Sequence, residues 1–249
     1  SSLCFRHSFQ LGNAGGSFGG GLYAERATAV LTNLHIADNL SEGGAGEDPA
    51  TNSSLGNGGG FAASRSDVTL GQANIVNNVA QGGVGEIFWG AGGGGGVYFS
   101  GFTDGNTLNL TNTIIAGNLA DVGQSGSGST TGGGGGGLFV NGGQANLTHV
   151  TLAQNQLGDS SMQGTGVVAI NNATMNLDYS IIASHASAIA LHAQPGSTVA
   201  AEPVEPPDAT AAHSAHSAHS TESAHTSHAA EPAHATHSAH THSAESEST

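Results

Sequence analysis

A repeat with two parts occupies most of the chain before its tail, and it constrains the fold more than any other feature. The first part is a glycine run followed by apolar residues: GGGLYA (Gly19–Ala24), GGGFAA (Gly58–Ala63), GGGVYF (Gly94–Phe99), GGGLFV (Gly135–Val140) and a weaker GVVAIN (Gly166–Asn171). The second part ends at Asn39, Asn78, Asn118, Asn155 and, in the last copy, His185. In every copy a leucine stands eight residues before that terminal residue, and isoleucine or leucine stands three before it.

The spacing between copies indicates a β-solenoid. Successive copies lie 29 to 41 residues apart, and the extra length sits between the Asn and the next glycine run, as in SEGGAGEDPATNSSLGN. Helical repeats keep a more constant length, whereas a solenoid tolerates insertions at one corner. Alternate apolar residues within short β-branched segments are typical of strands with one buried face.

The fixed offsets predict which side chains point inward. Like residues then stack on like residues about 4.8 Å apart from coil to coil. The first inward set is Ala29/Leu31, Val68/Leu70, Leu108/Leu110, Ala145/Leu147 and Met175/Leu177, and the second is Ile36, Ile75, Ile115, Leu152 and Ile182. We expect Asn39, Asn78, Asn118 and Asn155 to occupy turns of left-handed backbone and to form a hydrogen-bonded ladder.

These motifs resemble a known kind of repeat. "GGG(L/F/V)" followed by "(I/L)xxN" is similar to the GGAI and FxxN repeats of polymorphic outer-membrane proteins and related adhesin-like β-helix proteins. The resemblance covers roughly Phe5 to Ser187, with aliphatic residues in place of the usual Phe and His185 in place of the last Asn. It implies a right-handed parallel β-helix, a fold that hosts adhesins, lyases and structural proteins alike.

Composition excludes several partners. The chain has three arginines, no lysine and a net charge of −15, so nucleic acid and anionic membrane surfaces are disfavoured. Cys4 is the only cysteine, and no stretch approaches the roughly 18 apolar residues that span a bilayer. Few trypsin-like cleavage sites suit a long life outside the cell, so we expect a secreted or cell-surface protein.

The solenoid carries little that predicts catalysis. Asp38, Asp67, Asp104, Asp121, Asp159 and Asp178 fall at different repeat positions, so no acidic column forms as a glycoside-cleaving site would need. Glu47 and Asp48 are expected in a solvated loop. Trp89 is alone, and Tyr23, Tyr98 and Phe139 predict a structural aromatic ladder beside the glycines. His35 and His149 are solitary in their strands and are expected to be exposed or satisfied.

The C-terminal segment changes composition abruptly. We predict a β-helix of about five to six coils over residues 1–192, a proline-containing linker over 193–212 and a low-complexity extended tail over 213–249. Every third tail residue from His213 to His240 is His, or twice Glu, which matches the three residues per turn of polyproline II. One face would then carry His213, His216, His219, His225, His228, His234, His237 and His240. The next would carry the hydroxyls of Ser214, Ser217, Ser220, Ser223, Thr226, Ser238 and Thr241.

Three interpretations of the tail stay open. It is a spacer O-glycosylated on its hydroxyl face, a stripe that binds Zn²⁺, Cu²⁺ or Ni²⁺ through its histidines, or plain low-complexity sequence. For the whole chain we expect a non-enzymatic extracellular structural or adhesive protein. It would bind extracellular glycans or surfaces and self-associate, as a homo-oligomer or as a filament built by end-to-end stacking and tail contacts. The alternatives are a metal-binding surface protein and, third, a polysaccharide-active enzyme.

Overall fold

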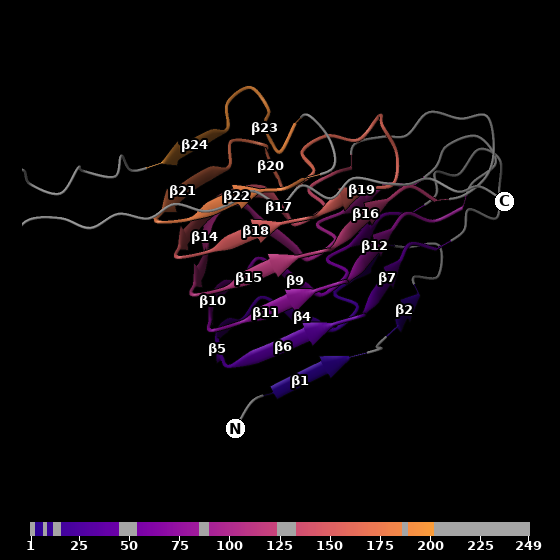
Figure 1. Ribbon diagram of the computed structural model, residues 1–249, viewed down its shortest axis with the longest axis horizontal. Coiled ribbons are helices and arrows are strands. Elements are labelled where there is room, and N and C mark those ends of the chain that lie inside the picture. Colours follow the sequence, from indigo (N-terminus) through magenta and orange to yellow (C-terminus); the bar gives the residue numbers. More distant parts are fainter. Residues whose placement is uncertain are drawn as a thin grey trace, which may run out of the picture. The chain divides into compact units, whose positions relative to one another are not determined.

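The chain winds into a parallel β-helix, as the repeat predicts. The computed structural model describes residues 3–6, 9–11, 16–44, 54–84, 90–123, 133–185 and 189–201. Within these ranges the regular elements are strands, and every strand pairs in parallel with the equivalent strand one coil away. Figure 1 shows the strands of one face rising in sequence order from β1 to β22.

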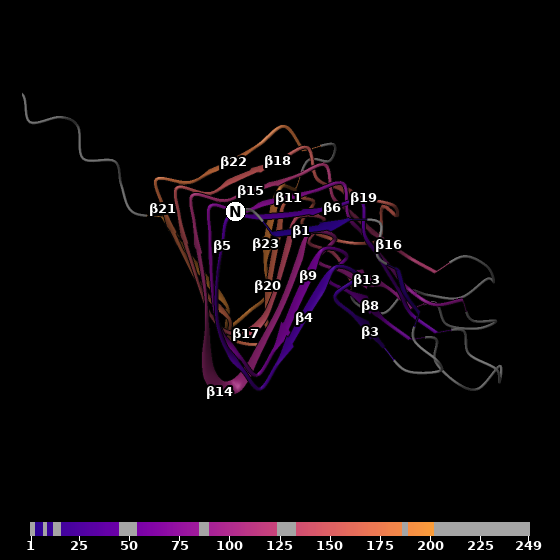
Figure 2. The same cartoon turned by 90° about the horizontal axis from the view of Figure 1, so that it is seen from below.

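Two sheets build the three faces of a triangular body (Figure 2). The six-stranded sheet contains β1 (Leu3–Arg6), β6 (Leu34–Ala37), β11 (Asn74–Val76), β15 (Ile114–Ala116), β18 (Thr151–Ala153) and β22 (Ile181–Ala183). The ten-stranded sheet bends round a corner to form the other two faces. One of these has β4 (Leu22–Glu25), β9 (Phe61–Ser64), β20 (Val167–Ile170) and β23 (Leu191–Ala193), and the other has β5 (Thr28–Thr32), β10 (Asp67–Gly71), β21 (Thr174–Asp178) and β24 (Thr198–Ala201). The long strands β14 (Val97–Thr111) and β17 (Leu138–Thr148) run through both faces.

A thin projection, which we call the fin, leaves one corner of the body (Figure 2). Its outgoing sheet has five strands: β2 (Phe9–Leu11), β7 (Leu40–Glu42), β12 (Val79–Gln81), β16 (Leu119–Asp121) and β19 (Gln156–Leu157). Its returning sheet has three: β3 (Ser17–Phe18), β8 (Gly56–Asn57) and β13 (Gly92–Gly93). The segments 45–53, 85–89 and 124–132, which lie outside the described residues, connect the two sheets. Most of the variable length of the repeat therefore falls between the two fin sheets. A smaller addition lies at the body corner within β14, where the register shifts between Ser100 and Thr107.

The core consists of side-chain columns that run along the axis. Leu31, Leu70, Leu110, Leu147 and Leu177 pair in consecutive register. Ile36, Ile75, Ile115, Leu152 and Ile182 do the same on the six-stranded sheet. Leu31, Leu177 and Ile182 are partly buried, and the other members of both columns are fully buried. The prediction of inward columns is confirmed, and each fully buried leucine contributes about 1.5–3 kcal/mol of burial free energy.

The backbone corrects one prediction. The left-handed residue is not the ladder Asn but the residue before it: Asp38, Asn77, Gly117 and Gln154 have φ between 55° and 65°. The corner therefore turns one residue earlier than expected. This leaves the Asn itself in ordinary backbone, with its side chain directed into the protein.

The β-helix also continues further than residue 192. β23 pairs with β20 and β24 pairs with β21, which carries the described fold to Ala201, within the segment predicted as a linker. The compact unit that contains these strands runs from Ser1 to Val204. The tail, 213–249, lies outside the described residues.

Candidate functional site

A buried asparagine ladder marks the neck where the fin joins the body. Asn78 Nδ2 donates to Ile36 O and to Asn118 Oδ1, both at 3.0 Å, and Asn118 Oδ1 also accepts from the Asn78 backbone N–H at 2.9 Å. Asn39 and Asn118 repeat the pattern, whereas Asn155 keeps only the donation from its Nδ2 to Ile115 O. Each amide satisfies backbone groups that the end of a body strand would otherwise leave buried and unpaired.

The glycine triplets pack directly against the asparagine ladder. A Cβ on Gly60 would lie 2.8 Å from Asn78 Nδ2, and one on Gly96 would lie 2.9 Å from Asn118 Nδ2. The third glycine of each triplet therefore leaves the space that the Asn side chain occupies. The two sequence signals, which are far apart along the chain, are adjacent in the structure.

His185 takes the place of the ladder Asn in the last copy. Its Nδ1 lies 3.4 Å from Asn155 O, and its Nε2 is buried with no hydrogen-bond partner among the described residues. Gly166 is adjacent, because a Cβ there would lie 2.8 Å from Nε2. The ladder thus ends on an imidazole that cannot reproduce all the bonds of an amide.

An aromatic cluster packs the fin against the outer face of β4, β9, β14 and β17. Tyr23, Ala62, Tyr98 and Phe139 occupy one column, and Phe18 from the fin fills the space beside Ala62. Ring centroids are 5.6 Å apart for Phe18–Tyr23, 6.0 Å for Phe18–Tyr98 and 5.5 Å for Tyr98–Phe139. Burial, with a smaller contribution from the Glu25 carboxylate, raises the pKa of Tyr23. The predicted ladder is thus interrupted by Ala62, and Phe18 links Tyr23 to Tyr98 in its place.

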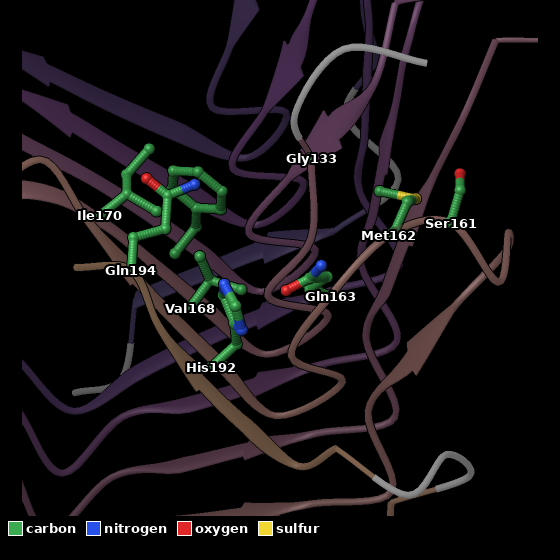
Figure 3. Close-up of a pocket in the computed structure, with 9 residues that line it drawn as sticks. Gly133, Ser161, Met162, Gln163, Val168, Ile170, His192 and Gln194 are labelled. Atoms are coloured by element: carbon green, nitrogen blue, oxygen red, sulfur yellow. The ribbon is translucent and has the colours of Figure 1, made fainter. Parts of the chain in front are cut away.

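A pocket of about 290 Å³ opens where this column loses its aromatic side chains (Figure 3). Val168 and His192 replace the rings, so a space forms beside Phe139. Met162 and Ile170 complete an apolar floor, while Ser161, Gln163 and Gln194 supply polar groups. This lining suits a small neutral molecule.

The pocket does not bring a nucleophile and a base together. Figure 3 shows Ser161 on the opposite side of the pocket from His192. The Ser161 hydroxyl and backbone N–H both donate to Asp159 Oδ1, and these bonds lower the pKa of Asp159. The serine therefore closes a turn.

The side chains directed outward from β5, β10, β21, β24 and the second halves of β14 and β17 form what we call the polar face. Its polar members are Thr28, Thr32, Asp67, Thr69, Thr107, Asn109, Thr111, Gln144, Asn146, Thr148, Thr174, Asn176, Asp178 and Thr198, held in register by the parallel pairing. In the outer coils the middle row is apolar, with Val30, which is 71 % exposed, at one end and Ala200 at the other. Asn176 Nδ2 donates to Asn146 Oδ1 and Asn146 Nδ2 donates to Asn109 Oδ1, each at 2.8 Å. The face therefore carries a second, partly exposed asparagine ladder.

The residues that the sequence suggests as metal and glycan sites belong to the tail. His213, His216, His219, His225, His228, His234, His237, His240 and the serines and threonines between them lie outside the described residues, as do Trp89, Glu47 and Asp48. In the part of the chain that the structure describes, no group of three or more His, Cys, Asp or Glu side chains could hold a metal ion. Within the same ranges no helix has the length and apolarity to cross a bilayer.

The comparisons with known proteins add no relative. No family model, no curated protein and no solved structure matches this chain.

Two features of the surface were missed from sequence. The pocket arises from the absence of aromatic side chains in one column, which has no local motif. His149, interpreted as solitary, stacks on Tyr179 with ring centroids 5.3 Å apart and an interplanar angle of 20°. The signal was present, because His149 and Tyr179 each stand two residues after a column leucine, Leu147 and Leu177.

Proposed function

We propose that this chain is a non-enzymatic extracellular protein, structural or adhesive, that uses the polar face as its contact surface. The observation that carries the proposal is the in-register array of threonine hydroxyls and asparagine amides on that face. From β10 to β21 each coil presents hydroxyl, amide or carboxylate groups about 4.8 Å from those of the last. A repeating partner can therefore meet many weak, equivalent contacts at once, which raises avidity without any strong single site.

Charge selects the kind of partner. The polar face carries the carboxylates of Asp67 and Asp178 and no arginine, on a chain of net charge −15. Anionic polymers and anionic lipid surfaces would be repelled. Neutral hydroxylated surfaces, such as extracellular polysaccharides, supply the donors and acceptors that amides and hydroxyls bind.

Self-association fits the same proposal. Among the described strands, β4 and β5 at one end and β23 and β24 at the other each pair with a coil on one side only. Unpaired strand edges are templates for a further strand, so end-to-end contact between copies would extend the array.

The test is a depletion assay with the full chain and suspended particles of cellulose, chitin and insoluble β-1,3-glucan. Bound protein is measured by loss from solution, and released sugar by reducing ends. We expect depletion by at least one polysaccharide, without sugar release and without dependence on added Zn²⁺. Sugar release would overturn the proposal in favour of an enzyme. Binding that requires Zn²⁺ and disappears when residues 213–249 are deleted would overturn it in favour of a metal-binding protein.

Sedimentation velocity measures the self-association over a wide concentration range. We expect species larger than the monomer as concentration rises. A chain that stays monomeric and is depleted by none of the particles would end the proposal.

A further inference from the structure

An exposed aromatic pair stands at the border of the polar face. Tyr179 follows β21 at the corner that leads to β22, and it is 66 % exposed. Its ring stacks on that of His149, which occupies the same corner one coil earlier and is also exposed. The two rings together form an aromatic platform that continues the polar face round its edge.

The backbone at this platform is unfavourable for the residues it carries. Tyr179 and His149 have φ values of 48° and 54°, in the left-handed region. The preceding coils place Asn33, Gln72 and Asn112 at the same corner. Asparagine tolerates this conformation well, whereas a bulky aromatic residue does not. Tyr179 therefore makes the folding free energy less favourable than Asn would. Because its side chain is exposed, it gains little stabilisation from burial.

Hydrogen-bonding groups lie directly beside the platform. Asp178 precedes Tyr179 and pairs with Thr148, which precedes His149. One position further into the face, Asn176 Nδ2 donates to Asn146 Oδ1 at 2.8 Å, so this amide row is fixed. An aromatic surface thus adjoins a carboxylate, a hydroxyl and ordered amides.

We propose that Tyr179 and His149, with Asp178 and Thr148, bind a pyranose ring of a neutral polysaccharide. This inference rests on the proposed adhesive function and names the partner and the place of contact. The C–H face of a sugar is apolar enough to pack on an aromatic ring, whose face is electron-rich. The hydroxyls at the sugar's edge donate to Asp178 and exchange hydrogen bonds with Thr148. Further sugars of the same chain then lie along the amides of the polar face.

The platform needs variants that separate binding from folding. Tyr179→Asn removes the ring and restores the residue type that Asn33 and Asn112 show at this corner, so it should fold at least as well as the wild type. Tyr179→Phe keeps the ring and is the matched control. Affinity electrophoresis of the full chain in native gels that contain hydroxyethylcellulose, soluble β-glucan or galactomannan measures the affinity, and thermal unfolding reports the fold.

We expect wild type and Tyr179→Phe to be retarded in at least one of these gels. Tyr179→Asn should lose at least tenfold in affinity without a lower melting temperature. Equal retardation of Tyr179→Asn would overturn the platform but leave the adhesive function standing. If the insoluble particles deplete the wild type from solution but none of the neutral gels retards it, the platform is likewise overturned and the adhesive function still stands. Salt-sensitive binding of poly-lysine, lost in Tyr179→Asn, would assign the platform to a cationic peptide instead.

Discussion

At the scale of single residues, asparagine forms two ladders: a buried one at the neck and a partly exposed one on the polar face. Asn118 is fully buried, and its side chain makes four hydrogen bonds: two accepted from Asn78 and two donated, to Ile75 O and Asn155 Oδ1. Asn109 lies on the polar face and accepts one bond from Asn146. A buried group that loses its partner costs about 1–3 kcal/mol, whereas a partly exposed one is compensated by water.

We therefore predict unequal losses for two matched variants. Asn118→Ala should lower the free energy of unfolding by about 3–5 kcal/mol, because it leaves several buried donors and acceptors unpaired. Asn109→Ala should lower it by about 1 kcal/mol or less. Denaturant titration followed by circular dichroism measures both. Similar losses in the two variants would show that the neck ladder is not held together by its amides.

At the scale of elements, the fin depends on glycine because its two sheets approach more closely than side chains allow. A Cβ on Gly92 would lie 2.0 Å from Ala80 O, and one on Gly56 would lie 2.0 Å from Gln81 O. These glycines do not have positive φ, so the requirement is for space. Gly71, in body strand β10, is different: the nearest atom to its Cβ would be Thr32 Cγ2 at 3.4 Å.

Gly92→Ala should therefore open the fin and spare the body. The added methyl must push β13 away from β12, so hydrogen exchange should rise in the peptides that contain β8, β12 and β13. Exchange in β10 and β15 should stay slow. Gly71→Ala, the control, should leave exchange unchanged throughout, since its methyl meets only ordinary contacts. Faster exchange in the body of Gly92→Ala would mean that body and fin unfold as one unit.

The same elements show what the sequence could and could not reveal. The leucine and isoleucine columns were predictable because identical residues recur at fixed offsets, and only stacking explains them. The fin was not, because β8 and β13 are two-residue strands made largely of glycine, too short to show an alternation. The left-handed corner was placed one residue late, since Asp38, Asn77, Gly117 and Gln154 share a conformation but no residue type.

At the scale of the whole molecule, stability should vary along the axis. Each coil pairs only with its two neighbours, so the free energy is close to a sum over coils and their interfaces. Leu70, Leu110 and Leu147 in the middle coils are fully buried, whereas Leu31 and Leu177 near the ends of the described fold are partly buried. Opening should therefore begin at the outer coils and proceed inward, and amide exchange should be slowest in β10, β14 and β17.

A substitution in the central column tests this description. Leu110→Ala should lower the free energy of unfolding by about 2–5 kcal/mol, because the coils on both sides pack against Leu110 and cannot collapse into the cavity. Exchange should then accelerate in β10 and β17 together. Leu177→Ala, nearer one end, should cost less and accelerate exchange in β21 and β24 while β5 and β10 stay as in the wild type. If Leu177→Ala raised exchange equally in β5, the coils would unfold as a single cooperative unit, and the additive account of the solenoid would fail.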